Sequence, residues 1–199
     1  FGGNKRVEER SSVIYPGARV ELFEDQANTS NFQSHLHNKY MPITKPLGSL
    51  GNPLKLCFAG LLMSSKGAHT FIEAIITLKK HGIAISAMLA GSTFDKDYKD
   101  FLIKRVFESG LESEIMFVGN LSRNKLARMF SINHIGIFAS IYPEAFGIVA
   151  AEMQASGLVL FTTGVGGAKE LVTDQKSGIL FKENNSLDLS TKILHLIRR

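Results

Sequence analysis

The chain has 199 residues, of which 44% are hydrophobic and 21% are charged, and its formal net charge is +5 at pH 7. This length allows one large domain with a complete core, and this composition is that of an ordinary globular protein. No apolar run approaches the roughly 18 residues that a membrane-spanning helix requires, and no signal-peptide pattern is recognisable. These features argue against an integral membrane protein and favour a cytoplasmic one.

The positive charge suits anionic partners, namely phosphorylated small molecules, an anionic membrane surface or nucleic acid. The basic residues are scattered and no nucleic-acid-binding module is recognisable, so we do not expect nucleic acid as a partner. A membrane-peripheral position, with an acceptor at the membrane surface, is compatible with this charge. The single cysteine, Cys57, cannot form an internal disulfide and fits a reducing, cytoplasmic setting.

The first part of the chain shows little periodic pattern. Residues 1–10 are polar and are interpreted as a linker, and a short strand is predicted at 13–15. Residues 24–53 are rich in Asn, Ser, Gln and Pro and are interpreted as a long surface loop with one short helix near 32–40. A loop of this length is unusual in a compact domain, which suggests contact with a region outside this chain.

From residue 55 onward, short apolar segments alternate with segments of helical period. Strands are predicted at 55–60, 85–90, 114–118, 135–139 and 159–162. Helices are predicted at 67–80, 95–109 and 123–131, from about 147 to 157, and at 168–172 and 187–198. This alternation predicts an α/β fold with a doubly wound, Rossmann-like parallel sheet, and we interpret the whole chain as one such domain.

Glycines stand at the ends of successive predicted strands, and ligands bind at this edge of a parallel sheet. These glycines are Gly60, Gly91, Gly119 and the cluster from Gly164 to Gly167. Each one alone is explained by an ordinary turn, but their shared position indicates a binding edge. Neither G-x-G-x-x-G nor the P-loop pattern occurs, so neither a dinucleotide site nor a P-loop is predicted.

The most informative stretch runs from Ala139 to Gly157 and is predicted to form the end of a strand, a tight loop and a buried helix. Glu144 lies just before this helix and Glu152 lies inside it, so the helical part of the step between them covers roughly 8 Å. The free N–H groups of residues 145–148 fall between the two carboxylates, where an anion is favoured. This arrangement suits a molecule with hydroxyl groups at both ends and a phosphate or sugar between them.

Each acid also has a purely structural interpretation. Glu144 can be a solvated loop acid that complements the helix dipole. Glu152 stands among apolar residues and needs partners if it is buried, although a surface position on a polar stripe stays open. The Asp-x-Asp pattern at 95–97 matches a metal-binding motif, but its position at a predicted helix start favours capping. His69 is interpreted as a partly buried structural histidine, and no metal site is predicted.

An ordered series of motifs resembles a known family. It consists of Phe58-Ala59-Gly60-Leu61-Leu62 with Lys66-Gly67, Leu89-Ala90-Gly91, Phe117-Val118-Gly119, Pro143-Glu144-Ala145-Phe146-Gly147, Glu152, Gly157 and Gly166-Gly167-Ala168-Lys169-Glu170. Together these motifs resemble the carboxyl-terminal, donor-binding half of retaining GT-B glycosyltransferases, in particular glycosyltransferase family 4 (group 1). The resemblance covers about residues 12 to 182. It implies one half of a GT-B fold, with the amino-terminal, acceptor-binding half outside this chain.

The resemblance also implies roles for individual residues. Glu144 would hold hydroxyls of the transferred sugar, Glu152 would hold the ribose, and Lys66 would neutralise the diphosphate as it leaves. The backbone of Asn120 and Leu121 would meet the base. The other donor-binding positions are Gly60, Gly91, Ala145, Phe146, Gly147 and Ile148. No metal or other cofactor is implied, because basic side chains and helix ends balance the charge of a nucleoside-diphosphate sugar, and both UDP and GDP sugars stay open.

Leu61 departs from the family pattern, which often has an arginine there as a second cation for the diphosphate. Removing one such preorganised group costs on the order of 10²–10³ in rate, which weakens catalysis without abolishing it. Two hypotheses follow. The chain is either the donor-binding half of an active retaining glycosyltransferase, inefficient by itself, or a nucleotide-sugar-binding module that has lost transfer activity.

Overall fold

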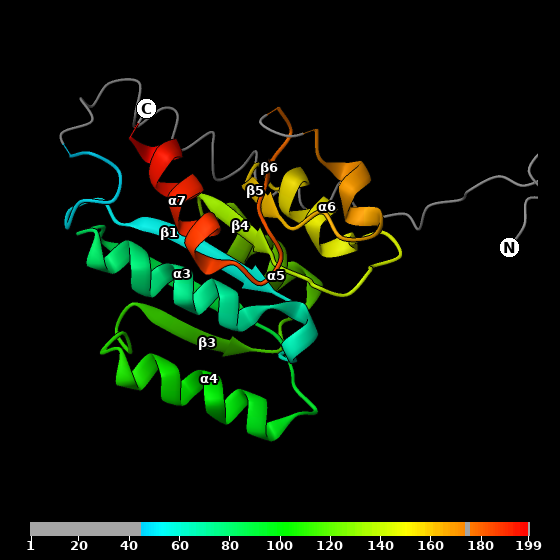
Figure 1. The fold of residues 1–199 in the computed structure, drawn as a ribbon, viewed down its shortest axis with the longest axis horizontal. Helices are drawn as coiled ribbons and strands as arrows, with labels where there is room; N and C mark the ends of the chain where they lie inside the picture. The colour runs from blue at the N-terminus through cyan, green and yellow to red at the C-terminus, as the bar shows by residue number, and fades with distance from the viewer. Residues whose placement is uncertain (1–44, 174–175, 199) are drawn as a thin grey trace, which may run out of the picture.

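The computed structural model describes residues 45–173 and 176–198, which Figure 1 shows as a ribbon. Six parallel strands form one sheet in the order β3-β2-β1-β4-β5-β6. The strands are β1 (Leu54–Ala59), β2 (Ile85–Ala90), β3 (Ile115–Gly119), β4 (Ile135–Phe138), β5 (Val159–Thr162) and β6 (Ile179–Leu180). The order reverses between β1 and β4, which creates the switch point at which open α/β sheets bind ligands.

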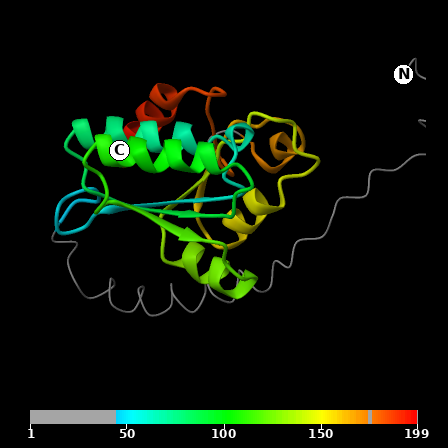
Figure 2. The same cartoon turned by 90° about the horizontal axis from the view of Figure 1, so that it is seen from below.

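Helices cover both faces of this sheet, as Figure 2 shows. The helices are α3 (Ala68–Lys80), α4 (Lys96–Glu108), α5 (Arg123–Ser131), α6 (Ile148–Ala155) and α7 (Ser186–Ile197), with short 3-10 helices η1 (Ser64–Lys66) and η2 (Gly167–Leu171). The core on one face contains side chains of α3, α4 and α7, and the core on the other contains side chains of α5 and α6. The doubly wound α/β fold predicted from the sequence is therefore confirmed.

The packing of α6 on β4 places a charged residue deep in the molecule. A Cβ atom at Gly136 of β4 would lie only 2.8 Å from Met153 Sδ, so a larger residue there would force the Met153 side chain of α6 to move. Both Met153 and its neighbour Glu152 are 0% exposed. The helix therefore buries a carboxylate beside a methionine that packs directly on the sheet.

The predicted boundaries agree with the structure to within two residues from β1 to α6 and again at α7. The strands predicted at 85–90 and 159–162 and the helix predicted at 123–131 are confirmed without change. The helix predicted at 168–172 is wrong in type, because η2 is a 3-10 helix. The sequence does not predict β6, since a strand of 2 residues is too short to show a period.

Several predictions for the first part of the chain lie outside the described residues. They are the linker at 1–10, the strand at 13–15, the helix near 32–40 and most of the loop at 24–53. The described end of that loop, residues 45–53, forms turns with one isolated bridge between Ser49 and Asn52.

Candidate functional site

Glycines join the carboxyl ends of β1, β2 and β3. The Gly60 N–H donates to the Ala90 carbonyl at 3.0 Å, and the Gly91 N–H donates to the Gly119 carbonyl at 2.8 Å. A Cβ atom at Gly91 would collide with the Gly60 carbonyl oxygen. The predicted glycine edge therefore exists, and its backbones are packed too tightly at Gly91 for any side chain.

The turn that carries Lys66 is fixed against the loop after β4. Gly67 has φ of 74°, and a Cβ atom there would collide with the Ala139 carbonyl. The Ile141 N–H also donates to the Ser65 carbonyl at 2.9 Å. Because only glycine enters this left-handed region at little cost, Lys66-Gly67 is a backbone requirement as well as a source of charge.

This contact brings Lys66 to Glu144, 78 positions further along the chain. Lys66 Nζ forms an ion pair with Glu144 Oε1, and the Ser140 hydroxyl donates to the same oxygen at 2.8 Å. The two charged side chains are 25% and 21% exposed. Both predicted catalytic residues thus lie together, half-buried, at the carboxyl end of β4.

The glycine cluster after β5 holds the backbone of Glu144. Glu144 and Gly166 form a parallel bridge, and the Gly167 N–H donates to the Glu144 carbonyl at 2.7 Å. Gly166 has φ of 67° and ψ of −145°, and a Cβ atom there would strike the Glu144 backbone. The cluster therefore acts by letting two backbones approach each other, with no side chain of its own in the site.

A cavity of about 340 Å³ lies at this switch point, and we call it the β1–β4 cavity. Its lining residues are Phe58, Ala59, Gly60, Leu61, Lys66, Phe138, Ala139, Ser140, Glu144, Ala145, Phe146, Gly147, Ile148 and Val149. Seven of the eleven predicted site residues are in this set. The other four, Gly91, Asn120, Leu121 and Glu152, do not line it.

The amino end of α6 opens on the β1–β4 cavity. Gly147 is the N-cap with φ of 84°, and no side chain of the described residues caps the helix through a hydrogen bond. The Gly147 carbonyl accepts the Ala150 N–H at 2.9 Å, so the helix ladder starts at this residue. The N–H groups that precede Ala150 have no acceptor in that ladder and give this end of the cavity a partial positive charge.

Glu152 is paired with a residue that the sequence interpretation missed. Its carboxylate forms an ion pair with Arg123, the first residue of α5, whose side chain is 55% exposed. The alternative that Glu152 lies on an exposed polar stripe is wrong, since the residue is 0% exposed. No motif marks Arg123, because one basic residue at a helix start is common and its partner is distant in sequence.

The competing candidates have structural roles. Asp95 is the N-cap of α4 and accepts the Tyr98 N–H at 2.9 Å, as the capping interpretation predicts. The His69 ring lies between the Tyr98 hydroxyl at 2.8 Å and Asn184 Oδ1 at 2.7 Å, so it joins α3 to α4 and to the segment before α7. Within residues 45–173 and 176–198, no cluster of three or more His, Cys, Asp or Glu has the arrangement of a metal site.

Two further titratable groups, the buried Cys57 and the half-buried His134, have structural roles only. Burial raises the pKa of the Cys57 thiol far above its usual range, so it is no nucleophile at neutral pH. Burial and the nearby charge of Lys55 lower the pKa of His134, whose Nδ1 accepts the Lys55 N–H at 3.1 Å. His134 therefore serves as a neutral hydrogen-bond acceptor at the amino ends of β1 and β4.

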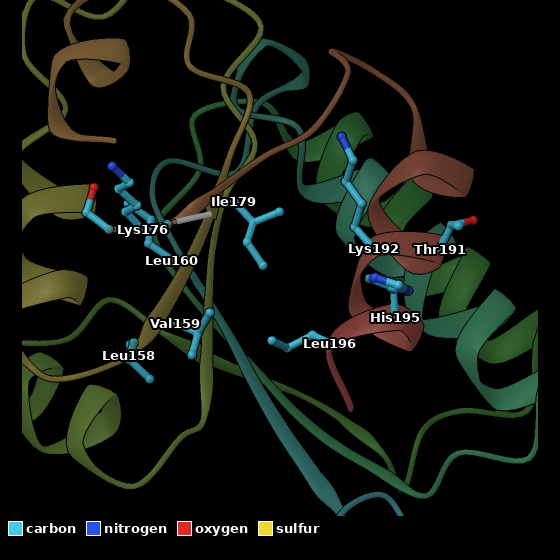
Figure 3. Close-up of a pocket in the computed structure, with 11 residues that line it drawn as sticks. Leu158, Val159, Leu160, Lys176, Ile179, Thr191, Lys192, His195 and Leu196 are labelled. Atoms are coloured by element: carbon cyan, nitrogen blue, oxygen red, sulfur yellow. The ribbon is translucent and has the colours of Figure 1, made fainter. Parts of the chain in front are cut away.

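A larger cavity of about 540 Å³, which we call the β5–α7 cavity, lies beside the start of β5, β6 and α7 (Figure 3). Its apolar lining includes Leu158, Val159, Ile179 and Leu196, and no acid lines it. Its Lys192 ammonium is already engaged, since it donates to the Leu180 carbonyl at 2.7 Å and pairs with Asp188 at 3.1 Å. The predicted site residues are all absent from this lining.

None of the helices that the structure describes has both the length and the apolar character needed to cross a bilayer.

Curated proteins from several bacteria are similar in sequence to this chain over part of their length. The glycogen synthase of Mycobacterium tuberculosis H37Rv is 29% identical over 127 residues, which are 64% of this chain and 30% of that protein. The D-inositol 3-phosphate glycosyltransferase of Mycobacterium marinum is 28% identical over 175 residues, covering 86% of this chain and 34% of that protein. The chain therefore spans about a third of the length of these curated relatives.

Solved structures show the same fold. A glycosyltransferase from Rickettsia africae has a TM-score of 0.75 and 25% identity, over 94% of this chain and 47% of that one. The Anabaena protein Alr3699/HepE, solved in complex with UDP and glucose, has a TM-score of 0.74 and 23% identity, over 95% of this chain and 48% of its own. The described sheet is thus a Rossmann-like half of a GT-B fold.

The family model described as "Glycosyl transferases group 1" matches residues 42–199, which include both the β1–β4 cavity and the Arg123–Glu152 pair. Because this match extends over well more than half of the chain, the chain belongs to the group 1 glycosyltransferases.

Proposed function

We propose that this chain is the donor-binding half of a retaining glycosyltransferase of family 4, which moves a sugar from a nucleoside-diphosphate sugar to an acceptor. The observation that carries the proposal is the Lys66–Glu144 ion pair inside the β1–β4 cavity, beside the amino end of α6. A partner half, outside this chain, would supply the acceptor site. The complexes of Alr3699/HepE with UDP and with UDP-glucose support a uridine diphosphate donor, with GDP sugars as the alternative.

The cavity provides one charge of each sign. Lys66 is the only cation and Glu144 the only anion among its lining residues, and apolar side chains such as Phe58 and Phe138 surround them. An apolar lining strengthens electrostatic interactions inside a site. We therefore assign Glu144 to the hydroxyls of the transferred sugar, while Lys66 and the N–H groups of residues 145–148 face the diphosphate.

These groups would act mainly on the leaving diphosphate. In the proposed step the bond between the anomeric carbon and the phosphate oxygen breaks, and the electron pair passes to that oxygen. The acceptor hydroxyl forms the new bond on the same face of the sugar, and its proton passes to the departing phosphate. The negative charge that develops on the phosphate is stabilised by Lys66 and the helix end, without a metal ion.

The four predicted residues outside the cavity lining would contact the nucleoside. A cavity of about 340 Å³ is at the small end of ligand sites, so we propose that it receives the sugar and diphosphate. The nucleoside would extend past Gly91 toward the backbone of Asn120 and Leu121 and toward Glu152. Glu152 would accept ribose hydroxyls, since neither of its oxygens has a regular hydrogen bond from a described residue.

The second candidate is a nucleotide-sugar-binding module without transfer activity. Leu61 favours it, since this residue lines the β1–β4 cavity where the resemblance leads us to expect a second cation. The two candidates predict the same binding of the donor. They differ in turnover, because the charge that develops during transfer needs more stabilisation than the ground state does.

Glu144→Gln in the whole protein tests the first candidate. Transfer, measured as nucleoside diphosphate released from a panel of UDP and GDP sugars, is expected to fall at least about 10²-fold, because the charged acceptor of the sugar hydroxyls is lost. UDP itself should still bind, since it has no sugar on its diphosphate. Glu112→Gln, which removes an exposed carboxylate elsewhere, should leave transfer unchanged.

Three results would contradict the proposal in different ways. Binding of nucleotide sugars without transfer in the unaltered protein would favour the non-catalytic module. Inverted configuration at the anomeric carbon of the product, measured by NMR, would exclude the retaining mechanism. If the unaltered protein binds none of the UDP, GDP and ADP sugars in a calorimetric panel, both candidates are excluded.

A further inference from the structure

The Arg123–Glu152 pair joins two helices that the chain order separates. Arg123 is the first residue of α5, directly after the loop that follows β3, and Glu152 lies in the second turn of α6. Arg123 is 55% exposed at its side chain, while Glu152 is 0% exposed. The pair therefore links a side chain in contact with solvent to a fully buried carboxylate.

A carboxylate that is removed from water needs a compensating charge. Arg123 supplies it, and the ion pair joins Arg123 Nη1 to Glu152 Oε1. Both carboxylate oxygens are covered, yet neither has a hydrogen bond of regular geometry to any described residue. Since a carboxylate accepts up to about four hydrogen bonds, most of the accepting capacity of Glu152 is unused, including all of that at Oε2.

We propose that Arg123 is a positioning residue of the donor site, which holds Glu152 through Oε1 and leaves Oε2 to accept a ribose hydroxyl of the donor. This inference rests on the proposed function, in which Glu152 meets the ribose. Arg123 keeps its pair with Oε1 in the complex, and the solvent on the outer side of its side chain leaves room for the small shift that admits the ribose. The buried carboxylate stays where the packing of α6 on β4 places it.

A competing arrangement gives opposite results. If Arg123 only covered Glu152 in the free protein, the ribose would have to displace it, and removal of the arginine would strengthen binding. If Arg123 holds and compensates the carboxylate in the complex as well, its removal weakens binding, and only for ligands that carry ribose hydroxyls.

The test is a calorimetric titration of the whole protein with UDP and with 2′,3′-dideoxy-UDP, and with the corresponding GDP pair in parallel. Hydrogen bonds to charged groups contribute enough that the unaltered protein should prefer UDP by about 10- to 100-fold. In Arg123→Ala this preference should fall below about threefold, through weaker binding of UDP, while binding of the dideoxy ligand stays within about threefold. Arg123→Lys should restore part of the preference, because it keeps the charge.

A double-mutant cycle separates the proposed role from a merely structural one. Glu152→Gln should lower the preference for ribose by itself, and adding Arg123→Ala to it should cause no further loss. Arg128→Ala is the matched control, since it removes an exposed arginine from the same helix and leaves the Arg123–Glu152 pair in place. It should leave the preference unchanged, and unchanged dideoxy-UDP binding reports that each variant is folded.

Several outcomes would overturn the inference. They are tighter UDP binding in Arg123→Ala, equal losses for both ligands, and losses that add in the double mutant. In all three the unaltered protein still binds UDP or GDP, so the proposed function survives. If the unaltered protein binds neither diphosphate, the proposed function fails and the role of Arg123 fails with it.

Discussion

The β1–β4 cavity and the β5–α7 cavity lie on one sheet but are lined by different kinds of structural element. The larger one, about 540 Å³, is bordered by side chains from the start of β5, from β6 and from α7, and one of its lysines is neutralised by Asp188. The smaller one, about 340 Å³, is bordered by strand ends, a helix start and the Lys66–Glu144 pair. Volume alone would select the cavity that contains none of the predicted site residues.

The two cavities differ in the backbone segments that border them. At the β1–β4 cavity three glycines with positive φ, namely Gly67, Gly147 and Gly166, let separate loops touch and expose N–H groups at the start of α6. The β5–α7 cavity has no such helix start among its lining residues. A site for a diphosphate needs fixed dipoles and a cation in a confined space, and only the smaller cavity combines them.

The largest expected effect is that of Lys66→Ala, which removes the only cation of the smaller cavity. Transfer by the whole protein should fall by about 10²- to 10³-fold, because the leaving diphosphate loses its main counter-charge. Initial rates with UDP and GDP sugars measure it. Lys80→Ala, at the exposed end of α3, is the control with the same change of charge. Equal rates for Lys66→Ala and the unaltered protein would remove Lys66 from the mechanism.

Gly166→Ala should lower the free energy of unfolding and weaken donor binding together. The alanine adopts a φ, ψ pair that only glycine adopts readily, at a cost of about 1–3 kcal/mol, and its Cβ strikes the Glu144 backbone. Thermal unfolding and UDP-sugar titration measure the two effects. The control is Gly82→Ala, where φ is 78° but no atom lies within 4 Å of the added Cβ. Gly82→Ala should lower stability only, and a loss of donor binding in this variant would mean that backbone strain weakens binding without any contact with Glu144.

Leu61→Arg should strengthen the binding of a diphosphate in the β1–β4 cavity. Leu61 lines it with a residue exposure of 37%, so an arginine there can reach a bound diphosphate. A charge-assisted hydrogen bond at a half-exposed site suggests about tenfold tighter binding of UDP. Leu61→Gln, which adds polarity without charge, should show little of this gain. No gain with arginine would indicate that another cation already serves the diphosphate.

Mild acid should destabilise the opposite edge of the sheet through His134. Because the pKa of His134 is lowered in the folded state, the unfolded chain takes up the proton first as pH falls through the usual value of about 6.5. Stability should therefore decrease over this range until the folded state is protonated as well. His134→Asn keeps an acceptor near Nδ1 and should flatten the dependence of the unfolding temperature on pH. An unchanged slope in this variant would assign the effect to another group.

The smallest expected effect comes from the larger cavity. Thr191→Phe places a ring at an exposed position of its lining, and UDP affinity should stay within about twofold, since surface changes of this kind are worth about 0.5 kcal/mol. A strong loss of UDP affinity would mean that the β5–α7 cavity takes part in donor binding.

Sequence reasoning reached much of the site because its motifs are local. Glu144 and residues 145–148 belong to one strand–loop–helix unit, whose apolar residues and glycine positions indicate where the helix begins. Lys66 followed from a resemblance of motif order, and its pairing with Glu144, 78 positions away, was not predicted but appears in the structure. Arg123 was not predicted, because a basic residue at a helix start is common and has no single functional meaning.

The alternation of apolar strands and helices and the positions of the glycines can be read from the sequence, because burial period and backbone freedom act over a few neighbouring residues. The tertiary structure alone decided that Glu152 is buried, that Arg123 compensates it, and that the smaller cavity has the Lys66–Glu144 pair in it. These contacts join residues tens of positions apart. They depend on how closely α6 packs on Gly136 and how tightly the loops after β1, β4 and β5 meet, and no local pattern encodes those distances.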